Sequence, residues 1–83
     1  MPILLRENNI RVLVNPGDHE PLHVHVIDGE LEVKIDISGE EASVLEKGRK
    51  RQNTTTAKHT RAAISLCQAN LPYLKAEAAK YYV

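Results

Sequence analysis

Two histidines separated by one residue, His23 and His25, are the part of this 83-residue sequence best suited to chemistry. They lie in an alternating segment typical of a β-strand, so both side chains leave the same face, roughly 7 Å apart. The pair Asp28-Gly29 follows, and between two alternating segments it predicts a β-hairpin with a two-residue type I′ turn. That hairpin would pair His25 with Glu32 and His23 with Lys34, which places a carboxylate beside the histidines.

Imidazole and carboxylate groups in this arrangement indicate a site for a divalent transition-metal ion. The predicted ligands are His23, His25 and Glu32, with His19 folding back from the preceding loop. Such a set suits Zn²⁺, Mn²⁺, Fe²⁺ or Ni²⁺. The alternative is that the histidines lie on the solvent face of the hairpin and bind no ligand. No catalytic base, nucleophile and oxyanion stabiliser accompany them, so we predict no catalytic residues and favour a protein that is not an enzyme.

The same hairpin organises the predicted sheet, which occupies residues 1–47. Two short strands are expected before it, at residues 3–5 and 10–14. After it, residues 42–47 supply either a fifth strand or a short helical turn. The second face of the hairpin is apolar and would pack against the rest of the chain, and it consists of Val24, Val26, Leu31, Val33, Ile35 and Ile37.

A helix over residues 56–82 is predicted after a connector at 48–55. A threonine at position 54, 55 or 56 can cap its N-terminus. Pro72 interrupts it, either as a kink or in the first turn of a second helix capped by Asn70. The apolar stripe keeps its phase across this break, which favours one long bent helix. The stripe recurs every three or four residues, at Thr60, Ile64, Cys67, Leu71, Leu74, Ala78 and Tyr81.

Length and composition limit the class of protein. A chain of 83 residues without Phe or Trp holds one domain with a small aliphatic core, here an α+β domain over residues 1–83, and so favours an oligomer or a partner protein. A single cysteine, Cys67, excludes an intrachain disulfide and is typical of a reducing compartment. No apolar run approaches the ~18 residues of a membrane span, and no signal peptide precedes the domain. We therefore expect a cytoplasmic protein.

Charge is unevenly distributed, although the net charge is zero. Residues 1–46 carry a net charge of −7 and residues 47–83 a net charge of +7. The two halves can attract each other within one domain, or the basic half can contact nucleic acid or an acidic protein. No aromatic residue alternates with the densest basic segment, so base stacking is not predicted. The residues predicted for such a contact are Lys47, Arg49, Lys50, Arg51, Lys58 and Arg61.

Nearly the whole chain resembles one protein family. Residues 19–26 read His-Glu-Pro-Leu-His-Val-His-Val, after the turn at residues 6–9 and before the hairpin and the helix. This order resembles the Domain of Unknown Function 4160 family of small prokaryotic proteins, whose motif is His-x-Pro-Pro-His-x-His-Val. Leu22 replaces the second proline, and Tyr81-Tyr82 stands where relatives often carry a tryptophan. The positions that match the motif are His19, Pro21, His23, His25 and Val26.

The resemblance implies that the protein binds a partner, and it implies no particular reaction. The family has no established activity, and its members are often encoded beside another small protein family, as in toxin–antitoxin pairs. It therefore implies a small cytoplasmic protein that binds a partner encoded nearby, and a homo-oligomer is the other arrangement left open. Three functions remain: an interaction module of a two-gene system, a metal-binding protein or metal-dependent hydrolase using His23, His25 and Glu32, and nucleic-acid binding through the basic half.

Overall fold

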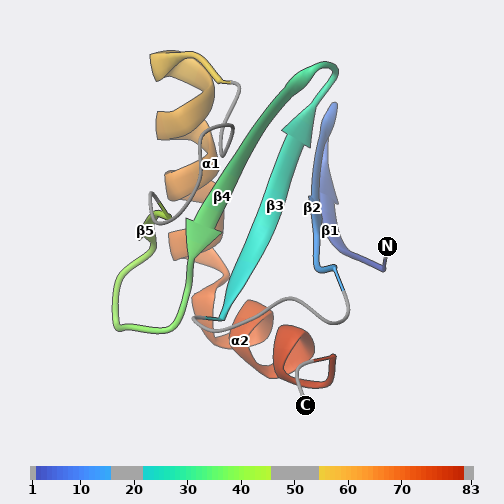
Figure 1. Cartoon of the computed structure of the whole chain (residues 1–83), viewed down its shortest axis with the longest axis vertical. Helices are drawn as coiled ribbons and strands as arrows, with labels where there is room; N and C mark the ends of the chain where they lie inside the picture. The colour runs from blue at the N-terminus through green and yellow to red at the C-terminus, as the bar shows by residue number, and fades with distance from the viewer. Residues whose placement is uncertain (1, 16–21, 46–54, 82–83) are drawn as a thin grey trace.

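The computed structural model describes residues 2–15, 22–45 and 55–81, which form one antiparallel sheet and two helices (Figure 1). Each strand pairs with its neighbour in the chain, so the order in the sheet is the order in the sequence. The strands are β1 (Ile3–Glu7), β2 (Ile10–Leu13), β3 (His23–Asp28), β4 (Leu31–Asp36) and β5 (Ser43–Val44). The helices are α1 (Ala57–Ala69) and α2 (Leu71–Ala79). The predicted α+β fold is confirmed.

The two expectations for the middle of the chain have different outcomes. Of the two options for residues 42–47, a short strand forms at Ser43–Val44. The predicted connector at 48–55 lies outside the described residues except for Thr55.

Within the described part of the chain, neither helix is long and apolar enough to span a membrane.

The hairpin between β3 and β4 turns one residue later than predicted. Asp28 pairs with Leu31, so the two turn residues are Gly29 and Glu30. Gly29 has a φ of +64°, whereas Glu30 stays outside the left-handed region. A glycine with positive φ in the first turn position is typical of a type II′ turn, because a type I′ turn needs positive φ at both positions. The predicted turn at Asp28-Gly29 is therefore wrong in its position and in its type.

The later turn changes every pair of the hairpin but leaves each side chain on its predicted face. Moving the turn by one residue moves each cross-strand partner by two, and the side-chain period of a strand is also two. Lys34 therefore lies opposite His25, and Asp36 lies opposite His23. The predicted pairing of His25 with Glu32 is wrong, yet Glu32 still shares a face with both histidines.

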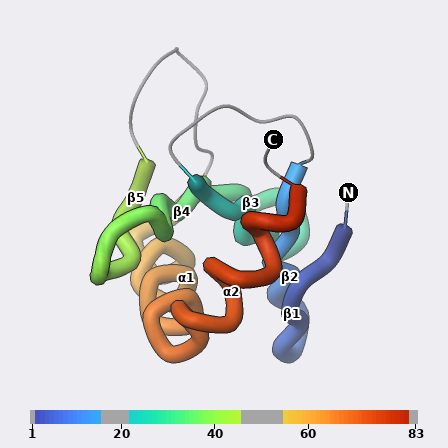
Figure 2. Tube along the Cα trace, turned by 90° about the horizontal axis from the view of Figure 1, so that it is seen from below, coloured from blue at the N-terminus to red at the C-terminus, as the bar shows by residue number. Residues whose placement is uncertain are grey.

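The core lies between the sheet and the two helices, which cover the same face (Figure 2). Its members are aliphatic or small, as the composition requires. From the sheet side come the fully buried Val12, Val14, Val24, Val26, Val33, Ile35 and Ile37. The helices contribute Ala63, Cys67, Leu71, Leu74 and Ala78.

The first helix begins at a threonine cap, as predicted, and follows the predicted stripe only from Cys67 onward. Thr56 is the N-cap, and its Oγ1 accepts a hydrogen bond from the backbone N–H of His59 at 3.1 Å. The buried residues of α1 are His59, Ala63 and Cys67, spaced by four. Thr60 and Ile64 of the predicted stripe are only half-buried. The predicted stripe is off by one position in the first turns of α1, and it is confirmed further on, where the buried members are Cys67, Leu71, Leu74 and Ala78.

Two helices replace the single bent helix that the stripe favoured. Pro72 has no N–H, and its ring would clash with the carbonyl of Gln68 in a continuous helix. The backbone N–H of Asn70 donates to the carbonyl of Cys67 at 3.2 Å, and its Nδ2 donates to the carbonyl of Leu66 at 2.9 Å. The side chain of Asn70 therefore closes α1 and makes no capping bond to α2. Pro72 occupies the first turn of α2, where no N–H is needed.

Candidate functional site

Both histidines of the predicted site are buried on the face of the sheet opposite the helices. They alternate with the two fully buried core valines of β3, so they leave its other face. His23 is 6% exposed and His25 is 5% exposed. Their ring centroids lie 5.4 Å apart, with the ring planes tilted by 55°. The alternative that these histidines lie on a solvent-exposed face is therefore wrong for both residues.

Glu32 holds the second histidine directly. Its Oε2 lies 2.9 Å from Nδ1 of His25, across the diagonal of the hairpin. A carboxylate only accepts, so this bond places a proton on Nδ1 and the lone pair of the neutral ring on Nε2. The Glu32 side chain is 41% exposed, so the carboxylate joins a buried ring to the surface. This carboxylate–imidazole pair is the arrangement that orients histidines in metal and proton-transfer sites.

The structure places three of the four predicted metal ligands on one face of the hairpin. His23, His25 and Glu32 share one face, while His19 lies outside the described residues. Asp36, opposite His23, uses its Oδ1 in the following turn, where it accepts from the backbone N–H and the hydroxyl of Ser38 at 2.8 and 2.6 Å. Among residues 2–15, 22–45 and 55–81, no group of three or more His, Cys, Asp and Glu side chains is placed to hold a metal ion.

The predicted basic contact residues are described only in part. Lys58 and Arg61 are exposed on α1, one turn apart. The helix contains no acidic residue to neutralise them. The other four, Lys47, Arg49, Lys50 and Arg51, lie outside the described residues.

His59 is a buried polar residue that the sequence reasoning did not single out. It is 5% exposed, and its Nε2 donates to the carbonyl of Val26 at 3.2 Å, which ties the start of α1 to β3. A cavity of about 370 Å³ adjoins His59, between the beginning of α1 and the two hairpin turns. The spacing of four between His59, Ala63 and Cys67 was the available signal, but the chosen stripe shared only Cys67 with it.

The thiol of Cys67 is not suited to act as a nucleophile. Cys67 faces the core from α1 and is fully buried. Burial in apolar surroundings raises the pKa of its thiol from 9.0 to about 12. The thiol therefore stays protonated at neutral pH.

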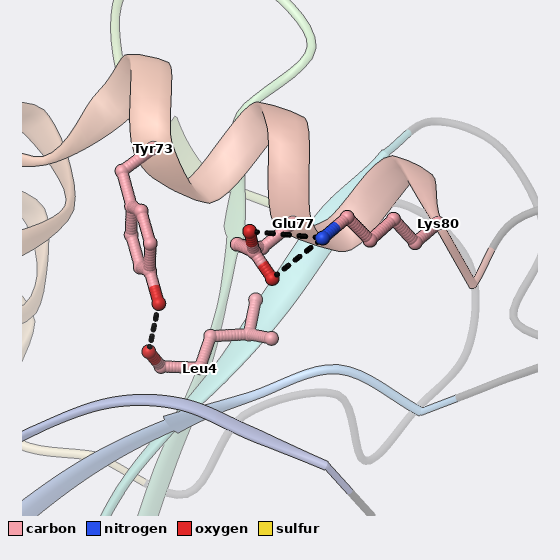
Figure 3. A network of polar contacts seen from close by, with 4 residues as sticks. All are labelled: Leu4, Tyr73, Glu77 and Lys80. Atoms are coloured by element: carbon pink, nitrogen blue, oxygen red, sulfur yellow. Dashed lines mark hydrogen bonds and ion pairs between the residues drawn. The ribbon is translucent and has the colours of Figure 1, made fainter.

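Two large apolar side chains reach the surface at the edge strand β1. Ile3 is 43% exposed and Tyr73 of α2 is 48% exposed. The Tyr73 hydroxyl donates to the carbonyl of Leu4 at 3.0 Å, as Figure 3 shows. Glu77 lies one turn after Tyr73 on the same side of the helix. It accepts a hydrogen bond at 3.2 Å from Nζ of Lys80, the C-cap of α2. We call Ile3, Leu4, Tyr73, Glu77 and Lys80 the β1–α2 surface.

Comparison with known proteins relates this chain to a protein family. The family model described as a domain of unknown function (DUF4160) matches residues 9–77, from β2 into α2. The matched region contains the two buried histidines and Glu32, together with His59 and Tyr73. The searches of curated proteins and of solved structures found no match.

Proposed function

This chain belongs to the DUF4160 family, and we propose that it is a protein-interaction module, one half of a two-gene, toxin–antitoxin-like system. The module binds a second, different small protein through the β1–α2 surface. The observation that carries the proposal is the exposure of Ile3 on β1 and of Tyr73 on α2, the two exposed large hydrophobic residues of the described chain, with the Tyr73 hydroxyl bonded to the carbonyl of Leu4, the residue after Ile3. Large apolar side chains are exposed at a cost, and those gathered on one part of a surface are typical of interaction sites.

Tyr73 has the chemistry of an interface anchor. Tyrosine is enriched among the residues that dominate binding energy, because its ring is large and has few rotatable bonds. Its hydroxyl is already bonded to the Leu4 carbonyl. A partner can therefore cover the ring without leaving the hydroxyl buried and unsatisfied, which would otherwise cost free energy.

The β1 edge favours a different protein over a second copy of this chain. Two copies would associate most simply by pairing their edge strands. A β-bulge between Ile3 and Leu5 interrupts the regular ladder of β1, and the Tyr73 hydroxyl occupies the Leu4 carbonyl. Both features oppose strand-to-strand pairing. Recognition through the side chains of Ile3 and Tyr73 remains available, and the gene arrangement implied by the family resemblance supplies a neighbouring protein as partner.

Co-expression with the product of each adjacent gene tests the proposal. Protein purified without a histidine tag is analysed by size-exclusion chromatography with light scattering, and we expect a complex with one neighbour. Tyr73→Ala should weaken that complex by about 30-fold, the effect of losing roughly 2 kcal/mol at an interface anchor. Ile3→Ser should weaken it less. Arg61→Ala, an exposed change on α1, is the matched control and should leave it unchanged.

Three outcomes would overturn this function. They are the absence of a complex with every adjacent gene product, a complex indifferent to Tyr73→Ala, and a homodimer that needs no partner. Thermal unfolding of each variant, compared with the parent chain, separates lost binding from lost folding.

A second candidate, nucleic-acid binding, is favoured by the cations of α1. Lys58 and Arg61 are exposed one turn apart on a helix without acidic residues. Phosphate contacts by lysine and arginine give affinity that falls steeply as salt rises. Binding to mixed-sequence RNA, measured by fluorescence anisotropy at several salt concentrations, should weaken on Lys58→Ala plus Arg61→Ala and lose part of its salt dependence. Binding that ignores both salt and the double substitution would exclude this candidate.

A further inference from the structure

We propose that the cavity between the beginning of α1 and the two hairpin turns binds a free α-amino acid with an apolar side chain. Its volume of about 370 Å³ lies within the range of small-ligand sites, roughly 300–1,000 Å³. Its wall includes a carboxylate, Asp28, a cation, Lys58, and a buried imidazole, His59. The cavity lies at the end of the molecule where α1 begins (Figure 1), and none of its lining residues belongs to the β1–α2 surface.

Asp28 occupies a position of the sheet that faces the helices. It follows the core residues Val24 and Val26 at intervals of two, so its side chain leaves the same face. In the register it lies between Ile10 of β2 and Leu31 of β4. Within the described part of the chain, the half-buried Asp28 side chain makes no hydrogen bond or ion pair. A carboxylate in such a place is costly unless a donor or a cation reaches it, which indicates a ligand that carries one.

His59 supplies a second acceptor toward the same space. Its Nε2 donates to the carbonyl of Val26, so the neutral ring carries its lone pair on Nδ1. Nδ1 has no hydrogen-bond partner among the described residues, although every fully buried side-chain nitrogen and oxygen there has one. The exposed 5% of His59 therefore includes Nδ1, and the space that this residue lines is the cavity. An ammonium group in the cavity thus meets two acceptors, Nδ1 and the Asp28 carboxylate.

Lys58 provides the opposite charge. Its side chain is exposed in the first turn of α1, where the helix dipole also favours an anion. Among the described residues neither Asp28 nor Lys58 has an ion-pair partner, so both charges can contact a ligand. A roughly spherical space of 370 Å³ is about 9 Å across, which lets one small molecule reach both. An ammonium and a carboxylate on the same carbon match this pair of charges, whereas a simple amine or a simple acid matches only one of them.

The remaining wall of the cavity selects the side chain of the amino acid. Ile10, Leu31 and Ala62 line it with aliphatic groups. Contact with these groups removes apolar surface from water, which favours an aliphatic ligand side chain over a charged one. We therefore expect L-leucine to bind more tightly than L-glutamate or L-lysine.

Titration of the isotope-labelled full chain with L-leucine, followed by NMR, tests the proposal. We expect saturable shifts from one site per chain, confined to backbone amides around the cavity, among them those of Ile10, Leu31 and His59. At roughly tenfold excess over Kd, L-leucine should raise Tm by about 5–10 °C. N-acetyl-L-leucine lacks the ammonium group and isoamylamine lacks the carboxylate, so each should bind at least about tenfold more weakly than L-leucine.

Substitution of the two charged residues separates their contributions. Asp28→Asn should weaken L-leucine binding about 10- to 100-fold, because a charge-assisted hydrogen bond is lost. Glu30→Gln, an exposed change in the adjoining turn, is its matched control and should have no effect. Lys58→Gln should weaken binding about 2- to 5-fold, because an exposed ion pair contributes less. Lys75→Gln, on α2, is the control for Lys58→Gln.

Asp28→Leu separates lost binding from lost folding. It replaces the unpaired carboxylate by an apolar group between two aliphatic neighbours, so Tm without ligand should not fall. Binding of L-leucine should nevertheless be abolished. A variant that unfolds leaves the comparison of Asp28→Asn with Glu30→Gln to decide.

Four results would overturn the site. The first is the absence of NMR shifts with L-leucine up to about 10 mM, well above a Kd of about 1 mM. The second is equal binding of L-leucine and N-acetyl-L-leucine, and the third is equal binding of L-leucine and L-glutamate. The fourth is an Asp28→Asn variant that binds L-leucine as tightly as Glu30→Gln does.

Discussion

Cys67 offers the sharpest quantitative test of the packing between α1 and the sheet. Its side chain is fully buried, and burial raises the pKa of the thiol from 9.0 to about 12. Only the thiolate reacts with disulfide reagents. At pH 8 a thiol with a pKa of 9.0 is about 10% ionised, and one with a pKa of about 12 is about 0.01% ionised. We therefore expect Cys67 to react about a thousandfold more slowly in the native state than in the unfolded chain.

The assay follows the reaction of the protein with an aromatic disulfide at pH 8, with and without urea. Cys67 is the only cysteine, so the colour released at completion should correspond to one thiol per chain. Cys67→Ala supplies the background rate. A native reaction within tenfold of the rate in urea would refute the burial of this residue and with it the orientation of α1.

The same group makes stability depend on pH, and the direction follows from proton counting. Well below pH 9 the thiol is protonated in both the native and the unfolded state, so it does not make the free energy of unfolding depend on pH. Between pH 9 and about 12 the unfolded chain has lost this proton and the native chain has kept it. The free energy of unfolding should therefore fall as pH rises, by at most about 1.4 kcal/mol per pH unit from this group. Subtracting the profile of Cys67→Ala removes contributions from other groups, and a flat difference between pH 9 and 11 would contradict the raised pKa.

Two further substitutions probe the helices. Leu74→Ala removes a fully buried side chain at the centre of α2 and should lower the free energy of unfolding by about 2–5 kcal/mol, measured by urea unfolding; a loss under 1 kcal/mol would place α2 off the core. Thr56→Ala removes the hydrogen bond to the backbone N–H of His59 and should cost about 1 kcal/mol. Hydrogen exchange should show that loss as faster exchange in the first turn of α1, and unchanged protection there would argue against the cap.

Alternation along β3 and β4 predicted the faces of the hairpin correctly and its turn incorrectly. The faces depend only on the parity of residue numbers, which survives a shift of the turn by one residue. The turn depends on which residue takes positive φ, and Asp28-Gly29 and Gly29-Glu30 are both acceptable turn sequences that share the same glycine. A type I′ turn at Asp28-Gly29 and a type II′ turn at Gly29-Glu30 differ in position by one residue. Local sequence could not choose between them.

The environment of the histidines was beyond local reasoning for a different reason. Alternation predicts that His23 and His25 leave the face opposite the valines, but it cannot predict how much of that face is covered. Both rings proved to be buried. Glu32 was chosen as a neighbour of His25 from a wrong register, yet it reaches Nδ1 across the diagonal, because its side chain is long and lies on the same face.

The predicted helix stripe was off by one position at its first two residues, because the apolar scale overlooks histidine, and correct at Cys67, Leu71, Leu74 and Ala78. His59 is buried by its bond to the Val26 carbonyl, so a polar residue begins the buried stripe of α1. Counting from Thr60 instead gave Ile64, which is only half-buried. The break at Asn70, by contrast, follows from a rule that needs no tertiary information. In a continuous helix the ring of Pro72 would clash with the carbonyl of the residue four positions before it.

The order of the elements has a consequence for the chain as it is being made. All five strands lie within the first 44 residues, whereas the helices that cover the apolar side of the sheet begin at residue 57. A nascent or truncated chain that ends between these points can pair its strands but leaves seven valine and isoleucine side chains bare. Such a fragment would be prone to aggregation and a natural client for chaperones until the last third of the chain is made.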